Sequence, residues 1–223
     1  MNKVLILQLD STEKPGFITK YLNSKRVDKT VLPLFKKATL APTDYFTHLI
    51  VLPSPMNTSD YAQHPFLWYA KSIIRDFLFQ KKPILGVCMG SQLLAEILGE
   101  KIRKANRAEV GFYPITFVKD SRITNGIERK NLQVFEWHSM QIATHMHISQ
   151  IAKSANCKTQ IFQFSDNVFG VQFHLEITEK LLLSYYKKFD PNRIYKDVKN
   201  QKNQLQMFEK TQKQILDNFL QIG

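Results

Sequence analysis

Cys88 stands in the pattern G-V-C-M-G, with Gly86 and Gly90 two residues to either side of it. An apolar run over residues 84–87 leads into the cysteine, and leucines and isoleucines at helical spacing follow it. A nucleophile between two such glycines is typical of a sharp strand-to-helix turn, which lifts the side chain clear of the sheet. The helix N-terminus also favours a thiolate over a thiol. The pattern predicts a catalytic cysteine, with a buried structural cysteine as the alternative.

A cysteine nucleophile needs a base, and the base needs a group that orients it. Among the six histidines, His174 directly follows a predicted strand, 168–173, and Glu176 comes two residues later. Residues two apart in an extended segment point to the same side, so Glu176 can hold one imidazole nitrogen while the other faces the sulfur of Cys88. A His-x-Glu pair on its own is most simply a surface pair. Its occurrence together with the cysteine turn favours a Cys-His-Glu triad.

The elements that must position these residues alternate over the first hundred positions. Apolar runs predict strands at 4–9, 31–35, 48–52 and 84–87, and helical patterns occupy 17–22, 62–80 and the segment after Cys88. This alternation predicts an α/β fold with a mostly parallel central sheet, flanked by helices in the flavodoxin-like manner. Active sites of such sheets lie beyond the carboxyl ends of the strands. We therefore expect the loop 53–56 to meet the turn 86–90.

The second half of the chain has shorter apolar segments. Strands are predicted at 111–118, 133–137, 150–154, 160–163 and 168–173, followed by a helix at 178–189 that ends at Pro191. One or two C-terminal helices are expected at about 195–222. Because no repeat or flexible linker stands out, we expect a single domain over residues 1–223.

Composition restricts the class of protein. The net charge of +12 comes from basic residues that are scattered rather than clustered, which predicts a solvated lysine-rich surface and argues against a nucleic-acid partner. The sequence has no apolar run of 18 residues, and its N-terminus is typical of a buried strand rather than a signal peptide. Its two cysteines, and the lack of zinc-ligand spacing, predict a cytoplasmic, reduced protein without a structural metal and with no membrane partner.

Four segments together resemble the class I, triad-type glutamine amidotransferases. The similarity is strongest to stand-alone proteins related to the amidotransferase domain of GMP synthase, and it covers nearly the whole chain. PILGVCMGSQLLAEILG is similar to the family's G-x-C-x-G-x-Q turn, and VFGVQFHLE to its strand ending in F-H-P-E. VFEWHSMQI resembles the W-H-G-D segment, and EVGFYPITF resembles the E-x-G strand.

The resemblance implies a reaction and a role for each matching residue. Cys88 would attack the side-chain amide of L-glutamine, form a γ-glutamyl thioester and release ammonia, with His174 as base and Glu176 as its orienting group. No cofactor or metal is expected. The resemblance places the oxyanion hole at the backbone N–H groups of Ser54 and Met89. It implies that glutamine is held by Gln92, His138, Ser139 and Met140.

Three departures from the family pattern bear on these roles. Pro53 and Ser54 replace paired glycines, and Ser54 would be strained if its position requires a positive φ. The loop is then expected to rest in an inactive conformation, with the carbonyl of Ser54 turned into the site. Leu175 replaces a proline between His174 and Glu176. Ser139 and Met140 stand where glycine and aspartate are common, which changes the groups that would contact glutamine.

Three functions remain open from the sequence. The first is a glutaminase whose ammonia goes to a synthase partner, because no G-x-x-x-x-G-K-[ST] pattern for nucleotide binding occurs in this sequence. The second is a hydrolase acting on another γ-glutamyl compound, such as an amide or peptide. The third is a catalytically silent binding module that keeps the fold, which the proline-serine loop favours and the complete triad opposes.

Overall fold

A central sheet of eight strands runs through the computed structural model, which describes residues 1–36 and 42–222, the side chains of 189 and 191–199 excepted. Together with a separate two-stranded sheet, β5 and β7, the described residues form ten strands: β1 (Lys3–Gln8), β2 (Asp28–Pro33), β3 (His48–Val51), β4 (Ile84–Val87), β5 (Ile102–Pro114), β6 (Thr116–Phe117), β7 (Gln133–Ile142), β8 (Ser149–Lys153), β9 (Ile161–Ser165) and β10 (Val168–Val171). The helices are α1 (Gly16–Ser24), α2 (Phe66–Phe79), α3 (Met89–Ile97), α4 (Glu179–Phe189) and α5 (Pro191–Leu220), with short 3-10 turns η1 (Thr43–Tyr45) and η2 (Arg122–Thr124).

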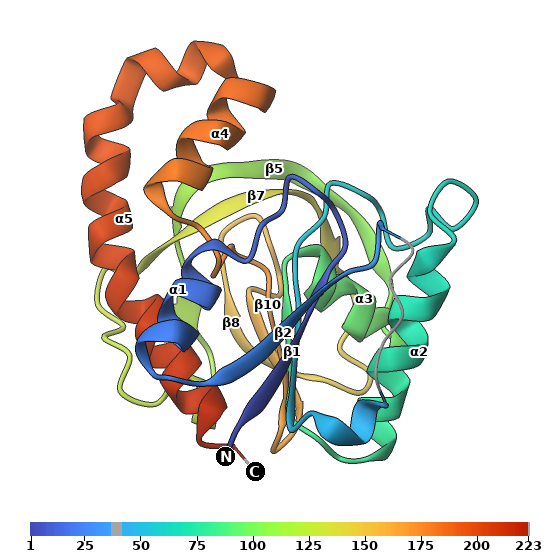
Figure 1. The fold of residues 1–223 in the computed structure, drawn as a ribbon. Helices are drawn as coiled ribbons and strands as arrows, with labels where there is room; N and C mark the ends of the chain where they lie inside the picture. Colours follow the sequence, from blue (N-terminus) through green and yellow to red (C-terminus); the bar gives the residue numbers. More distant parts are fainter. Residues whose placement is uncertain (37–41, 223) are drawn as a thin grey trace.

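The sheet is mostly parallel, as the alternation of strands and helices predicts. Its strand order is β2-β1-β3-β4-β10-β9-β8-β6, and the pairs from β2 to β10 are parallel. The last three strands add antiparallel pairs, and a two-residue turn, Asp166-Asn167, joins one of these pairs, β9 and β10. The carboxyl ends of β1, β3, β4 and β10 therefore lie at one edge, the upper one in Figure 1.

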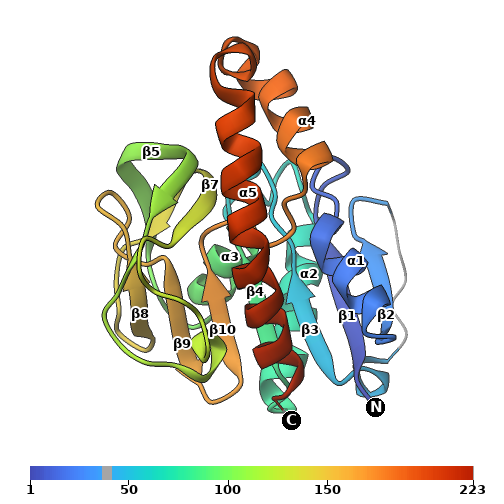
Figure 2. The same ribbon diagram turned by 90° about the vertical axis from the view of Figure 1, so that its left-hand side faces the viewer.

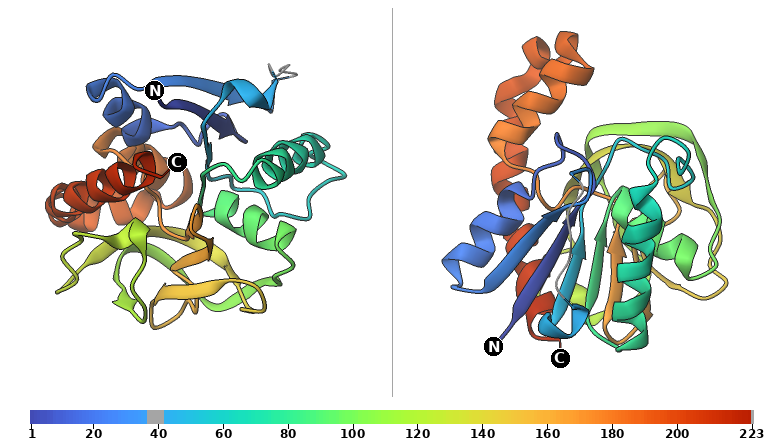
Figure 3. Two further views of the ribbon diagram at one scale, coloured as in Figure 1. Left: turned by 90° about the horizontal axis from the view of Figure 1, so that it is seen from below. Right: turned by 45° about the vertical axis from the view of Figure 1, so that its right-hand side comes forward.

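Helices cover both faces of this sheet. Figure 2 and Figure 3 show α1 and α5 on one face and α2 and α3 on the other. Alternate residues of β1 serve the two sides: Val4 and Ile6 pack in the core with α1 and α5, whereas Leu5 and Leu7 pack with α2 and α3. Because both faces are buried, β1 is a continuous apolar run rather than an alternating one. The described part of the chain contains no helix with the length and apolar character to cross a membrane.

A separate antiparallel pair, β5 and β7, arches over the carboxyl edge of the sheet (Figure 1). This corrects the strand predicted at 111–118. In the structure β5 begins at Ile102 and ends at Pro114, and Thr116–Phe117 forms β6, which pairs with β8 instead. The first half of β5 could not be predicted from the sequence. Its residues 103–107 are basic and largely exposed, and they lack the apolar alternation of a half-buried strand.

The last two helices are joined at Asp190, where the sequence predicts a break. A single helix, α5, occupies the region in which one or two C-terminal helices are expected, and it begins at Pro191 rather than near 195. Phe208, Ile215 and Phe219 of α5 are buried against the sheet. Asn2 donates a hydrogen bond to the carbonyl of Leu220 at 2.7 Å, so the two termini lie together at the lower end of Figure 1.

Candidate active site

Cys88 forms the turn between β4 and α3. Its backbone has φ 50° and ψ −115°, a conformation that costs a non-glycine residue about 1–3 kcal/mol. The N–H of Cys88 donates to the carbonyl of Val171 on β10 at 2.8 Å, which ties the turn to the neighbouring strand. The cysteine stands at the N-terminus of α3, where the helix dipole favours an anion. The structure thus has the strained turn that the glycine pattern predicts.

The two glycines allow this turn to fit beneath its neighbours. A Cβ atom on Gly86 would lie 2.6 Å from the Cα of Ser91, and one on Gly90 would lie 2.3 Å from the carbonyl oxygen of Val51. Both distances are shorter than any ordinary contact, and both neighbours are backbone atoms. Helix α3 can approach β3 and β4 this closely only because both positions lack side chains.

Alanine at position 90 is therefore expected to destabilise the fold. The added methyl group must push α3 away from β3, and overpacking of this kind costs about 1–3 kcal/mol. Urea denaturation of Gly90→Ala measures the loss in free energy of unfolding. The control is Ser72→Ala at an exposed position of α2, which is expected to change it by less than about 0.5 kcal/mol. Equal stabilities of Gly90→Ala and the parent protein would contradict the close approach.

His174 and Glu176 meet just beyond β10. The Nδ1 atom of His174 lies 2.6 Å from Oε1 of Glu176, and both side chains are buried. The strand itself ends at Val171, so the pair lies in a turn rather than in the extended segment that the spacing predicts. The turn is held by the N–H of Phe17, which donates to the carbonyl of Glu176 at 2.8 Å, and by Gln212 of α5. The side chain of Gln212 donates to the carbonyls of Leu175 and Ile177.

The charge state of His174 follows from its neighbours. Burial alone would lower the pKa of His174, but the negative charges of Glu176 and Cys88 outweigh it and hold the pKa well above its usual range. Since Nδ1 is engaged by Glu176, the Nε2 atom is the one left for Cys88. Such an imidazolium stabilises a thiolate, which is the reactive form of a cysteine.

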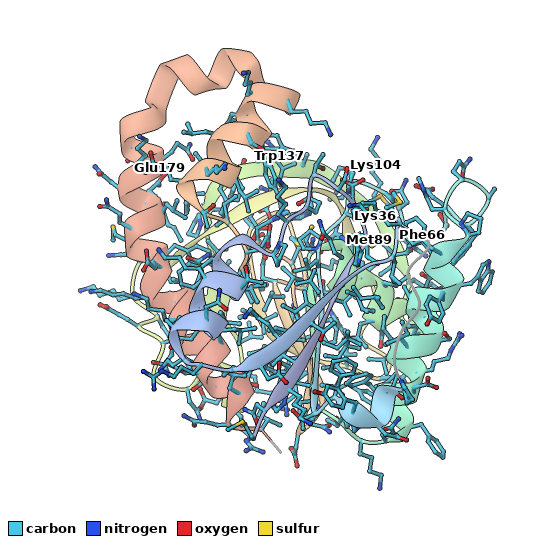
Figure 4. The ribbon with its side chains drawn as sticks, in the orientation of Figure 1. Lys36, Phe66, Met89, Lys104, Trp137 and Glu179 are labelled. Atoms are coloured by element: carbon cyan, nitrogen blue, oxygen red, sulfur yellow. The ribbon has the colours of Figure 1, made fainter. Side chains whose placement is uncertain are left out.

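A cavity of about 320 Å³ opens over Cys88. It lies at the carboxyl edge of the sheet, and two of its lining residues, Met89 and Trp137, are labelled in Figure 4. Eight of the nine residues singled out from the sequence line it, and Glu176 lies behind His174: the eight are Ser54, Cys88, Met89, Gln92, His138, Ser139, Met140 and His174. A larger hollow, about 520 Å³, lies beside α5 and includes none of them.

Gln92 links the cysteine turn to β7. Its side-chain nitrogen donates to the carbonyl of Met140 and to the side chain of Gln172, both at 3.0 Å. Gln172 in turn places its nitrogen 3.6 Å from the sulfur of Cys88. The bond from Gln92 to Met140 ties α3 to β7, whose residues 138–140 line the cavity.

A family profile described as "Glutamine amidotransferase class-I" matches residues 16–189 of the chain. The chain belongs to this family. Among its curated relatives is one subunit of the glutamine-hydrolysing GMP synthase of Sulfolobus acidocaldarius, 38% identical over 102 residues. That match covers 44% of this chain and 54% of the relative, so it spans about half the relative's length. A glutamine amidotransferase-like protein of Salmonella typhimurium is 26% identical, over 76% of this chain and 73% of its own.

Solved structures of glutamine amidotransferases have the same fold. One from Thermotoga maritima superposes with a TM-score of 0.88 at 24% identity, covering 98% of this chain and 96% of its own. Another from Methylobacillus flagellatus also gives 0.88, at 20% identity, with 99% and 94% covered. These similarities confirm the predicted α/β architecture.

The loop after β3 holds Ser54 outside the positive-φ region. Among the described residues other than glycine, a positive φ occurs at Arg26, Lys81, Cys88 and Asn131, and Ser54 is outside this group. The hydroxyl of Ser54 accepts a hydrogen bond from the N–H of Met56 at 3.2 Å, which stabilises the loop as an ordinary turn. Serine therefore adopts this conformation without backbone strain. A cost in conformational free energy would arise only if the loop moved Ser54 to a positive φ.

His138 has two buried carboxylates as neighbours, which the sequence did not single out as site residues. Its Nε2 atom lies 3.2 Å from Glu109 and 3.1 Å from Glu136, and register places both carboxylates on the paired strands β5 and β7. Burial opposes a charge on His138, but hydrogen bonds with the two carboxylates raise its pKa to about 10. His138 and the two carboxylates therefore form a buried cluster of ionisable groups in the cavity wall. Glu109 stands in the E-x-G segment, and that was the available signal.

Glu13 and Tyr185 also line the cavity, and the sequence patterns did not identify them as site residues. Glu13 follows β1, and Tyr185 projects from α4, so they are 172 positions apart in the chain. The location of Glu13 beyond the carboxyl end of a parallel strand was a general signal for it. Nothing in the local pattern of α4 distinguishes Tyr185 from the other buried aromatic residues.

Two sets of side chains in the described residues could be considered as metal ligands. One atom each of Glu109, His138 and Cys157 lie within 4.8 Å of one another, as do atoms of Glu13, His174 and Glu176. Glu109, however, accepts hydrogen bonds from Ser154, Asn156 and Gln160 besides its contact with His138. In the second set His174 and Tyr185 bond the carboxylates. Hydrogen bonds thus account for both sets, and we assign neither to a metal.

Proposed function

We propose that this protein hydrolyses the side-chain amide of L-glutamine through a Cys88-His174-Glu176 triad. The observation that carries the proposal is the convergence of the strained cysteine turn and the buried His174–Glu176 pair on one cavity. Membership of the class I glutamine amidotransferases supports glutamine as the substrate. The relatives named as glutamine-hydrolysing GMP synthase subunits support it further.

The proposed reaction has two halves. The sulfur of Cys88 attacks the amide carbon, and His174 protonates the departing nitrogen, which leaves as ammonia while a γ-glutamyl thioester remains. Water then attacks the thioester and gives its proton to His174, and glutamate leaves as the sulfur recovers its proton. In each half a negative oxygen develops, and we assign the backbone N–H groups of Met89 and Ser54 to stabilise it.

Glutamine is assigned to the cavity wall formed by Gln92 and residues 138–140. Gln92 already binds the carbonyl of Met140, so these groups are held together before substrate enters. Glu109 and Glu136 lie 3.2 and 3.1 Å from Nε2 of His138 and compensate its charge, so we assign the ring to hold this wall in place. Ammonia is expected to pass to a synthase partner, as the names of the GMP synthase subunits suggest for those relatives.

The cytoplasm is the compartment that suits this chemistry. Cys88 and Cys157 are both free thiols. A reducing compartment keeps a nucleophilic thiol from forming a disulfide.

A substrate comparison tests the proposed function. Release of ammonia and glutamate is measured with glutamine and with a series of γ-glutamyl amides and peptides, using Cys88→Ala as the control. Turnover of glutamine supports the proposal, and turnover of larger γ-glutamyl compounds alone would make the protein a γ-glutamyl hydrolase. Binding of glutamine without turnover of any substrate would identify a silent binding module.

Glycine at position 54 is expected to raise the basal glutaminase rate. The N–H of Ser54 serves an oxyanion only if the loop can turn it towards Cys88, and glycine reaches positive φ without the cost of about 1–3 kcal/mol that serine bears. Steady-state rates of Ser54→Gly and the parent protein measure the effect, and Ser54→Ala is the matched control because it lacks both the hydroxyl and the added freedom. A rate in Ser54→Gly no higher than in Ser54→Ala would contradict a conformational limit.

A further inference from the structure

Glu13 is a buried carboxylate at the active site that the proposed mechanism does not use. It lies in the segment between β1 and α1, it is 5% exposed, and it lines the cavity above Cys88. The hydroxyl of Tyr185 bonds Glu13, and the same hydroxyl lies 3.2 Å from Oε1 of Glu176. That oxygen of Glu176 is also the one bound by Nδ1 of His174. Glu13 is therefore joined to His174 through Tyr185 and Glu176.

Counting hydrogens shows what this arrangement requires. The hydroxyl of Tyr185 carries one hydrogen and can donate it to only one of the two carboxylates. If both are ionised, the other contact brings two acceptors together inside the protein, which is unfavourable. A proton on Glu13 removes the conflict, because Glu13 then donates to Tyr185, Tyr185 donates to Glu176, and Nδ1 of His174 donates to Glu176. Every contact in this chain is then a hydrogen bond.

We propose that Glu13 is a positioning residue that controls, through Tyr185, the hydrogen bond received by Glu176 and hence the proton affinity of His174. This inference rests on the proposed function for the role of His174. It adds a residue outside the triad that sets how readily the imidazolium and thiolate pair forms.

Burial, more than the neighbouring charges, raises the pKa of Glu13 above that of an exposed carboxyl group. Burial raises the pKa of Glu13 to about 7, against the opposing charge of His174, while the negative charges of Glu176 and Asp10 add to the rise and the bond from Tyr185 reduces it. Below this pH Glu13 is protonated and the chain of hydrogen bonds is complete.

Above this pH the hydrogen of Tyr185 turns to the ionised Glu13, and Glu176 loses one donor. A second negative charge also appears beside His174. Both changes favour the imidazolium, so the reactivity of Cys88 is expected to rise as Glu13 ionises.

The variant Glu13→Gln fixes the protonated arrangement, because its amide can donate to Tyr185 at every pH. We expect the rate of alkylation of Cys88 by iodoacetamide, measured between pH 5.5 and 9, to show an inflection near pH 7 in the parent protein and none in Glu13→Gln. At pH 8.5 the variant is expected to react more slowly than the parent protein, since it lacks the negative charge beside His174. Peptide mapping distinguishes Cys88 from Cys157, a buried thiol whose pKa is raised by burial.

Tyrosine variants test the route of the effect. In Tyr185→Phe the substitution Glu13→Gln should have a smaller effect than in the parent protein, because the connecting hydroxyl is gone. Tyr186→Phe is the matched control: Tyr186 is the next residue of α4, it is also buried, and its hydroxyl contacts Gln201 instead. It is expected to keep the parent pH profile. Should Glu13→Gln fail to fold, Tyr185→Phe alone tests the inference, because it breaks the link between Glu13 and Glu176 and is expected to weaken the inflection near pH 7.

Two results would overturn the inference. One is an unchanged pH profile in Glu13→Gln. The other is a rise in KM for glutamine with no change in the pH profile of kcat, which would make Glu13 a substrate contact. Failure of the proposed function gives a different result, namely no ammonia from glutamine while the alkylation of Cys88 still depends on Glu13.

Discussion

Replacing Cys88 with alanine is expected to lower the glutaminase rate by about 10⁴-fold or more, to the level of the background reaction. The variant cannot form the thioester, and loss of a catalytic nucleophile removes nearly all the turnover that a triad provides. The small change in volume at a 5% exposed side chain should leave the fold intact. The measurement is ammonia released from glutamine, with circular dichroism to confirm folding.

Labelling locates the nucleophile independently of the rate. A glutamine analogue with an electrophilic diazoketone, diazo-oxo-norleucine, should modify Cys88 and stop activity in step with the label. Cys157→Ala is the matched control, because Cys157 is equally buried but its sulfur contacts the carbonyl of Thr159 rather than a base. This control is expected to be labelled as the parent protein is. Label found on Cys157 alone would remove Cys88 from the mechanism.

Alanine at position 174 is expected to abolish turnover, whereas alanine at position 176 should leave a measurable residue. His174 transfers the proton in both halves of the reaction, and such transfer contributes about 10²–10⁴-fold. Glu176 acts only by orienting His174 and raising its pKa, so its removal loosens the base without eliminating it. Steady-state kinetics on both variants measures kcat.

The pH dependence of kcat further distinguishes the role of Glu176 from that of His174. Loss of Glu176 removes the largest influence that raises the pKa of His174, so the imidazolium in Glu176→Gln should lose its proton at a lower pH than in the parent protein. The glutamine variant keeps the shape of the side chain and guards against collapse of a buried site. Activity of His174→Ala equal to that of the parent protein would exclude the triad.

The cysteine turn could be predicted because its signals are local. Gly86, Cys88 and Gly90 lie within five positions, and each glycine has a contact that only glycine allows. The pairing of His174 with Glu176 was likewise predictable from their spacing, although the structure forms it in a turn that Phe17 and Gln212 hold rather than in a strand. The sequence thus predicted that His174 and Glu176 are in contact. It did not predict the turn that brings them together, because Phe17 and Gln212 belong to distant segments.

The remainder of the site depends on contacts between distant segments. Glu13 meets Tyr185 only because β1 and the turn after β10 end at the same edge of the sheet, with α4 packed above them. Glu136 follows the alternation of β7 in the sequence, yet its burial arises from pairing with β5, whose first half is basic and exposed. The spacing of apolar residues shows which side of one helix or strand is buried. It gives no information about a carboxylate whose partners lie on other helices or strands.

The contacts of Gln212 determine when, during synthesis of the chain, the turn at Glu176 can form. It bonds the carbonyls on both sides of Glu176, and it comes from the fifth helix, far along the chain from the turn that it holds. A ribosome that has completed all the strands has therefore not yet supplied the group that fixes this turn. The nascent chain can form its sheet and its cysteine turn early. The proposed base, His174, reaches its final setting only after the middle of α5 has emerged, so the proposed hydrolysis of glutamine can begin only after the sheet has formed.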